Sequence, residues 1–172
     1  MSVTLPNVVQ RLADLNARIR AAEADDHRPD FVYFGSPSPP VSNGDLQQVA
    51  GSFPESYLEF LQIADGWAGY FFAQDLFGAH DVLKQTAAYR SAVECAAAFF
   101  DGNGWPWESK DLFVIAKDRD GYGNLVVPRR GENAGKYIHC QPDPVVYESL
   151  AEYLAELIPF TEGYLQDKLN GD

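Results

Sequence analysis

Basic residues, sulfur-containing residues and long apolar runs are all scarce in this sequence. Its 172 residues include 13 Lys and Arg against 25 Asp and Glu, which gives a formal net charge of −12. Such an excess of carboxylates repels phosphate backbones over the whole surface, so the charge argues against nucleic acid as a partner. The same charge favours encounter with a basic protein, although many proteins are acidic only because acidity keeps them dispersed.

The scarcity of apolar runs and of cysteine bears on where the protein works. No stretch approaches membrane-spanning length, and the opening MSVTLPN lacks the basic start and apolar core of an export signal. The two cysteines are far apart, Cys95 in a helical pattern and Cys140 in a strand pattern. They predict two reduced thiols and no disulfide framework. We therefore expect a cytoplasmic protein without a membrane partner.

Apolar and aromatic residues, in contrast, are plentiful enough to build a core. They make up 46% of the chain and include three Trp, nine Tyr and eleven Phe. A chain of this length is typical of one domain, so residues 1–172 are predicted to fold as a single unit. The turn-rich segment Gly35–Gly44 is the best internal boundary. It is interpreted as a loop, because the residues before it are too few for a core of their own.

Apolar residues at helical spacing predict a first helix over residues 8–19, a short one at 46–49 and a third that starts at Pro54 and stops at Asp65-Gly66. A long helix is expected from about Asp81 to Phe99. The closing helix begins at Ser149, whose spacing from Glu152 matches a capping box, and is expected to end at Pro159, with one more short helix after it. The predicted core of the third and closing helices comprises Tyr57, Phe60, Leu61, Leu154 and Leu157.

Short runs rich in β-branched and aromatic residues predict strands between these helices. The expected strands are 31–34, 67–72, 112–117, 124–127 and 136–140. The last three are separated by Gly-containing turns, which indicates an antiparallel meander that the closing helix covers. The fold class expected is therefore α+β, one domain with a mainly antiparallel or mixed sheet flanked by helices.

The order of these elements resembles the SUKH superfamily. Three segments carry the resemblance: LQQVAGSFPESYLEFLQIADG at 46–66, FVIAKDRDGYGN at 113–124 and SLAEYLAELI at 149–158. They span a recognisable core of about residues 46–158. Residues 1–45, with the first helix, a short strand and the Pro-rich loop, have no counterpart in the pattern. The loop at Trp105-Pro106-Trp107 is also particular to this chain.

The resemblance implies a protein-binding function without catalysis or a cofactor. The superfamily includes bacterial immunity proteins, which neutralise toxins that are often nucleases or deaminases, and a fungal cell-wall synthesis regulator. The first role implies a basic toxin domain as the partner, blocked by occlusion. The alternative implied by the second is a regulatory or scaffold protein of the cell-wall regulator type. Fold alone does not fix function, so the choice between these roles depends on the individual residues.

The residues that could carry catalysis or bind metal do not form a recognisable set. His139 and Cys140 are neighbours on a predicted strand, so their side chains point to opposite faces and cannot form a dyad. The histidines His27, His80 and His139 lack metal-ligand spacing. The segment Asp118–Asn124 has a glycine at the fourth position of a calcium loop and no Glu follows at the twelfth, and it joins two strands, so a hairpin turn explains it better than a calcium or phosphate site.

Two features are candidates for contact with a partner. Trp105 and Trp107 lie in a Gly- and Pro-rich loop, where they can either anchor a partner or fold back to close the end of the core, and the second is the commoner outcome. Glu148, Glu152 and Glu156 recur every four residues on the expected outward face of the closing helix, with no basic residue at the following i+4 positions. Such a face is either simply solvated or a docking surface for a basic protein.

Overall fold

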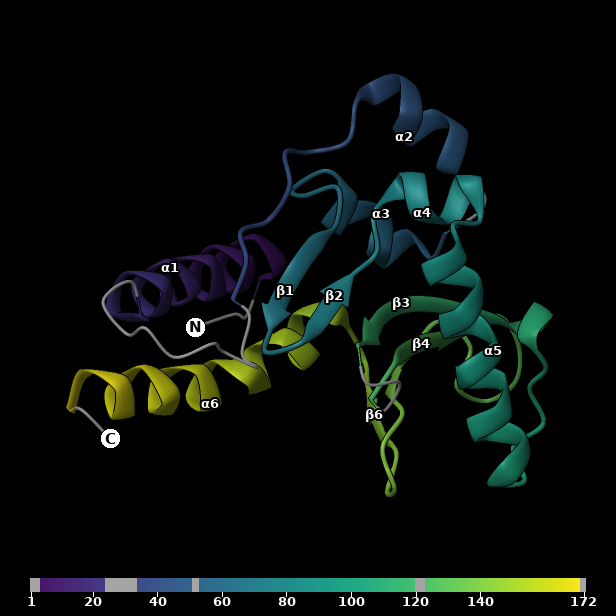
Figure 1. Cartoon of the computed structure of the whole chain (residues 1–172). Coiled ribbons are helices and arrows are strands. Elements are labelled where there is room, and N and C mark those ends of the chain that lie inside the picture. Colours follow the sequence, from purple (N-terminus) through teal and green to yellow (C-terminus); the bar gives the residue numbers. More distant parts are fainter. Residues whose placement is uncertain (1–3, 24–33, 51–52, 120–122, 171–172) are drawn as a thin grey trace.

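The computed structural model describes residues 4–23, 34–50, 53–119 and 123–170 and confirms a single α+β arrangement of helices around one antiparallel sheet (Figure 1). The helices are α1 (Leu5–Glu23), α2 (Asn43–Val49), α3 (Glu55–Leu61), α4 (Ala79–Lys84), α5 (Ala87–Gly102) and α6 (Leu150–Asn170), with a short 3-10 helix η1 (Ser109–Asp111). The strands are β1 (Trp67–Phe71), β2 (Gln74–Leu76), β3 (Leu112–Asp118), β4 (Leu125–Pro128), β5 (Tyr137–His139) and β6 (Val145–Tyr147).

The six strands pair in the order in which they follow along the chain, each antiparallel to the next. The predicted meander of β3, β4 and β5 is therefore correct, and β1, β2 and β6 extend the sheet on its two sides. Strands β2 and β6, three residues each, were not predicted, because a three-residue strand is too short to show a period-2 pattern. Of the expected strand at 31–34, residues 31–33 lie outside the described residues and Phe34 is not in a strand.

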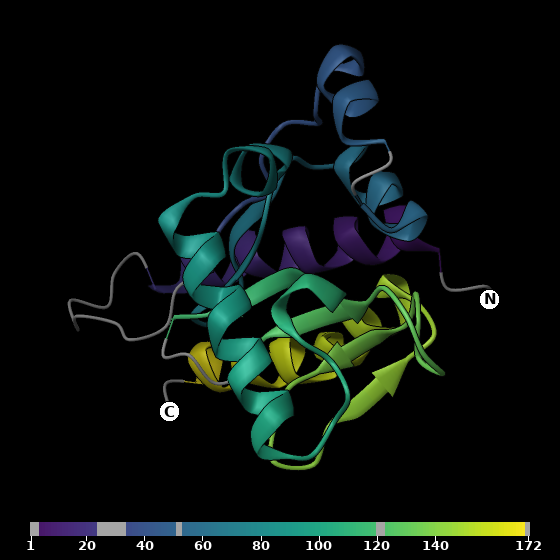
Figure 2. The same ribbon diagram turned by 90° about the vertical axis from the view of Figure 1, so that its right-hand side faces the viewer.

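Helices cover both faces of the sheet. Helices α1 and α6 lie side by side against one face, and α5 crosses the other (Figures 1 and 2). The apolar face of α1 is buried as its spacing predicts, but it also contains the fully buried Asn16. The Asn16 side-chain amide donates to the carbonyl of Tyr70 at 3.0 Å, which ties α1 to β1.

One continuous core joins the helices to the sheet. The predicted cluster of Tyr57, Phe60, Leu61, Leu154 and Leu157 is part of it, and each of these side chains is buried. Tyr57 extends across the core, where its hydroxyl donates to the carbonyl of Phe77. Trp67 is also buried in this cluster, as expected of a strand residue between helices.

The helix expected from Asp81 to Phe99 is wrong in one respect, because the structure divides it into α4 and α5. Gln85 adopts the left-handed conformation with φ of 49°, which ends α4. Thr86 is then the N-cap of α5, and its side chain accepts a hydrogen bond from the Tyr89 N–H. Thr favours this capping role over a helix interior, where its branched side chain is restricted. The apolar periodicity runs on through Gln85 and Thr86, and for this reason it did not reveal the break between α4 and α5.

The expectation that Pro159 ends the closing helix is also wrong. Helix α6 continues through Pro159 to Asn170, and the separate terminal helix expected after it is the second half of α6. Leu165 packs in a second cluster with Leu15, Ile19 and Phe34, so burial against α1 holds the chain helical beyond the proline. Proline in a helix interior costs about 3 kcal/mol, which tertiary packing can offset.

The predicted start of α6 is confirmed with one change in its hydrogen bonds. The Glu152 N–H donates to the Ser149 hydroxyl at 3.1 Å, as in a capping box. The Glu152 carboxylate, however, accepts from the N–H of Glu148 at 2.8 Å and not from that of Ser149. The cap therefore reaches one residue further back along the chain and fixes the direction in which β6 enters α6.

Candidate partner-binding site

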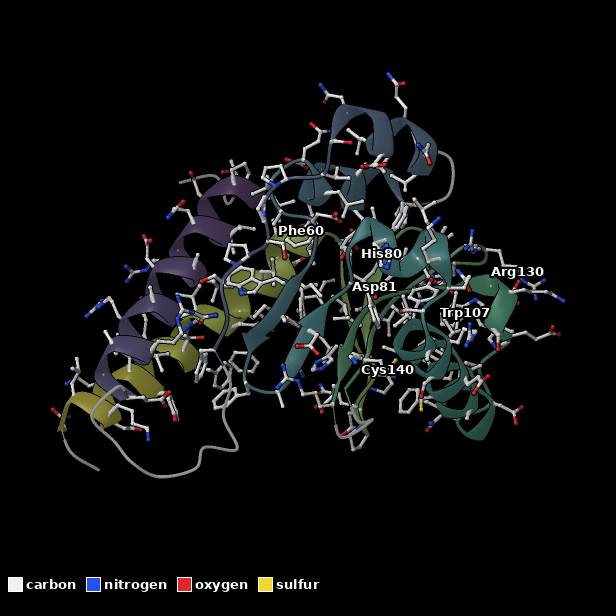
Figure 3. The ribbon with its side chains drawn as sticks, turned by 45° about the horizontal axis from the view of Figure 1, so that its top comes forward. Phe60, His80, Asp81, Trp107, Arg130 and Cys140 are labelled. Carbon is white, nitrogen blue, oxygen red and sulfur yellow. The ribbon has the colours of Figure 1, made fainter. Side chains whose placement is uncertain are left out.

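The tryptophan loop closes the end of the core, so its predicted role as a partner anchor is not supported for Trp107. Trp107 is buried, and its indole N–H donates to the carbonyl of Arg130 at 3.1 Å. Its ring lies 5.1 Å from that of Phe100 and 4.9 Å from that of Trp105, which is half-buried. Figure 3 shows Trp107 and Arg130 together beside α5. A loop Trp with an internal hydrogen-bond partner and apolar neighbours needs no external partner.

The three glutamates are exposed, but they are not the uncompensated series that their spacing suggested. Glu148 lies before α6 and forms an ion pair with Lys136 at 2.7 Å. Glu152 takes part in the helix cap, and Glu156 accepts a hydrogen bond from the Tyr147 hydroxyl at 2.9 Å. Burial and the nearby Glu156 carboxylate raise the pKa of Tyr147 to about 12, so this hydroxyl stays a donor. The carboxylates of Glu152 and Glu156 are thus held in fixed positions on α6.

These two glutamates border a groove along the outer side of α6. The groove has a volume of about 400 Å³ and is lined by Ser149, Ala151, Glu152, Ala155, Glu156 and Pro159. Residues three and four apart share one side of a helix, so Ala151, Ala155 and Pro159 form a line of small side chains next to the acidic line. Small residues allow another backbone to approach closely.

The acidic line ends at an exposed aromatic ring. Phe160 follows Glu156 at i+4, and 67% of its surface is accessible. A large exposed ring next to fixed carboxylates and small residues suits a segment that is both basic and apolar. A second copy of this chain fits poorly, because it would set glutamates against glutamates.

Strand β6 is the open edge of the sheet, but its backbone is poorly suited to strand addition. The Cys140 N–H donates to the Asn124 carbonyl at 2.8 Å, which fixes which residues of β5 bond to β4. Because bonding alternates along each strand, the register of β5 and β6 then directs the N–H and C=O of Val146 outward. The next outward positions are Pro144, which has no N–H, and Glu148, whose N–H is bonded to a carboxylate of α6. At the opposite edge, β1 is covered by the segment that begins at Gly35. These features favour the outer side of α6 over a sheet edge.

His139 and Cys140 do not have the ionisation states of a catalytic pair. Burial raises the pKa of the Cys140 thiol to about 12, and burial lowers the pKa of His139. These directions are opposite to those of a thiolate–imidazolium pair, so the two residues do not form an activated dyad. Both cysteines are free, as predicted, and Cys95 and Cys140 line one cavity.

Of the other histidines, His80 is exposed on α4 and His27 lies outside the described residues. Near the start of α4, the carboxylate of Asp65 accepts from the Ala79 N–H at 2.6 Å, and that of Asp81 accepts from Thr86 at 2.9 Å. These carboxylates hold the connection between β2 and α5. Across the described parts of the chain, no group of three His, Cys, Asp or Glu side chains is arranged to hold a metal ion.

No helix within the described ranges is long and apolar enough to cross a membrane. Comparison with known proteins adds no relative: no protein-family model matches the chain, and a search of the curated proteins found no significant match.

Proposed function

We propose that this chain is a non-enzymatic module that binds a basic protein domain along the outer side of α6, with neutralisation of a cognate toxin by occlusion as its role. The observation that supports this best is the groove beside Glu152 and Glu156, with its small-residue floor and the exposed Phe160 at its end. Complementary charge speeds association and selects the partner, while an exposed aromatic ring supplies apolar contact.

The role as an immunity protein rests on the resemblance of residues 46–158 to the SUKH superfamily. The net charge of −12 supports a basic partner, because it accelerates encounter with a positively charged surface. The two free cysteines are in keeping with a cytoplasmic location. The neutral states of His139 and Cys140 support a function without covalent catalysis.

The gene neighbourhood supplies the first test. If the adjacent gene encodes a large secreted protein with a basic C-terminal domain, this chain should bind that domain and restore the growth of cells that express it. An isolated gene, or neighbours concerned with the cell wall, together with no binding to any adjacent basic domain, would favour the regulatory or scaffold alternative.

Charge reversal then tests the surface. Glu156→Lys should slow association with the basic domain about tenfold at low salt and flatten its salt dependence. Glu94→Lys is the matched control, because Glu94 is an exposed acid on α5 and its reversal changes the net charge by the same amount. Phe160→Ala should instead raise the dissociation rate. Equal effects of the Glu156 and Glu94 reversals would remove α6 from the interface.

A further inference from the structure

A second concave site lies at the other end of the sheet from the tryptophan loop, where β2, β3, β4 and β5 meet α5. It has a volume of about 450 Å³, which is within the range of small-molecule sites. Its lining includes Phe99 and Cys95 from α5 and Cys140 and Pro142 after β5. Figure 3 shows Cys140 beside the sheet, where it faces α5. These side chains give the cavity apolar walls.

Polar atoms from three strands converge at one wall of this cavity. A side chain starting at Gly123 would place its Cβ 3.3 Å from Gln74 Nε2, 3.3 Å from His139 Nε2 and 3.6 Å from Asp118 Oδ2. Gly123 has a φ of +92°, a conformation that favours glycine, and a larger residue there would crowd this polar group. Convergent polar groups on an apolar cavity are the usual sign of a small-molecule site.

The orientation of Gln74 is fixed from behind. Its side-chain oxygen accepts hydrogen bonds from the hydroxyls of Tyr70 at 2.7 Å and Tyr153 at 3.2 Å, both of which are buried. The amide nitrogen is therefore directed toward Gly123 as a donor. Because two tyrosines set this orientation, the donor is in place before any ligand arrives.

His139 adds an atom that the protein leaves unsatisfied. Its Nε2 is buried and has no hydrogen-bond partner among the described residues. A buried polar atom without a partner destabilises the protein, so a ligand that bonds to it recovers this cost. Burial lowers the pKa of His139, so the ring is neutral at pH 7 and one of its nitrogens is an acceptor.

The charge of the lining limits the class of ligand. Of the described residues that line the cavity, Asp118 alone carries a charged side chain. Together with the net charge of −12, this disfavours phosphates and carboxylates. An N–H donor on the ligand suits the Asp118 carboxylate, and an adjacent acceptor suits the Gln74 amide nitrogen.

We propose that this cavity binds a small planar nitrogen heterocycle, with its flat faces against the apolar walls and an edge of adjacent N–H donor and ring-nitrogen acceptor toward Asp118, Gln74 and His139. Aminopurines and aminopyrimidines have such an edge. The site is separate from the groove on the outer side of α6 and does not depend on the function proposed for that groove.

The test is calorimetric titration of the full chain with adenine and with cytosine, with indole and AMP as comparison compounds. At least one of the two bases should bind with a dissociation constant below about 1 mM. Indole, which lacks the acceptor, and AMP, which adds a phosphate, should each bind at least tenfold more weakly than that base. No saturable binding of either base, or equal binding of indole or AMP, overturns the proposal.

Two further measurements locate the bound base. His139→Phe keeps a ring of similar shape without nitrogen and should weaken binding about tenfold, whereas His80→Phe, at the exposed histidine of α4, should leave it unchanged. In the unsubstituted protein, the base should slow alkylation of the exposed Cys95 thiol at the cavity wall. This second readout remains valid if His139→Phe fails to fold, and unchanged alkylation at saturating base contradicts the assignment.

Discussion

Replacing Leu165 by Ala tests whether the second half of α6 contributes to folding. Leu165 lies after Pro159, and 4% of its surface is exposed in the cluster it forms with Leu15, Ile19 and Phe34. Truncation of a buried leucine costs about 2–5 kcal/mol, depending on how far the site can collapse. This cluster is small and lies near the end of the helix, so we expect partial collapse and a loss of about 2–3 kcal/mol.

Leu169 provides the matched control in the same half of the same helix. It is 58% exposed, so Leu169→Ala should change the free energy of unfolding by less than about 0.5 kcal/mol. Urea denaturation followed by circular dichroism measures both variants, and thermal melts should show a fall of about 4–12 °C for Leu165→Ala alone. If the two variants unfold with equal free energies, the helix beyond Pro159 does not pack against α1.

Three other expectations follow from buried groups. Leu157→Ala, within the main core, should lower the free energy of unfolding by about 2–5 kcal/mol in the same urea assay. A loss below about 0.5 kcal/mol, which is typical of surface sites, would contradict the position of α6 against the core. Iodoacetamide without reductant should modify Cys95 in the folded protein, and Cys140 only after unfolding, as read by mass spectrometry; rapid labelling of both contradicts the burial of Cys140. Because the pKa of His139 is lowered in the folded state, the unfolded state binds more protons below about pH 6.5, so stability should fall as pH falls from there. His139→Phe should flatten this dependence, as measured by urea midpoints at pH 5 and 7, and an undiminished dependence in this variant would contradict the lowered pKa of His139.

The sequence was sufficient for the elements whose side chains repeat with a clear period. The spacing of Leu12, Leu15 and Ile19 identified α1, and the apolar runs of β3, β4 and β5 identified the meander, because long periodic segments report burial directly. Strands β2 and β6 carry too few residues for that signal. Asn16, whose amide is buried in an otherwise apolar helix face, gave no sign of its link to β1, since a single polar residue is compatible with exposure as well as burial.

The errors arose where distant segments decided a local outcome. Pro159 is a strong local signal for a helix end, yet α1 supplies the packing partner for Leu165 beyond it. Glu148 shares the i+4 spacing of Glu152 and Glu156, but it precedes α6 and binds Lys136 from the loop before β5. The cavity beside Gly123 gathers Gln74 from β2 and His139 from β5, which only the antiparallel sheet order brings together. Sequence reasoning considered His139 only as half of a dyad with Cys140, which it rejected, and no local signal pointed to Gln74.

The two sides of α6 explain why its outer surface is available to a partner. The inner side carries the buried leucines that join it to the sheet and to α1, so its position is fixed along most of its length. The outer side carries Ala151, Ala155 and Pro159, which leave a groove instead of a ridge. A helix held so firmly on one side loses little conformational freedom when a partner binds on the other. The favourable contacts of Glu156 and Phe160 can therefore contribute to affinity with little offsetting loss of entropy.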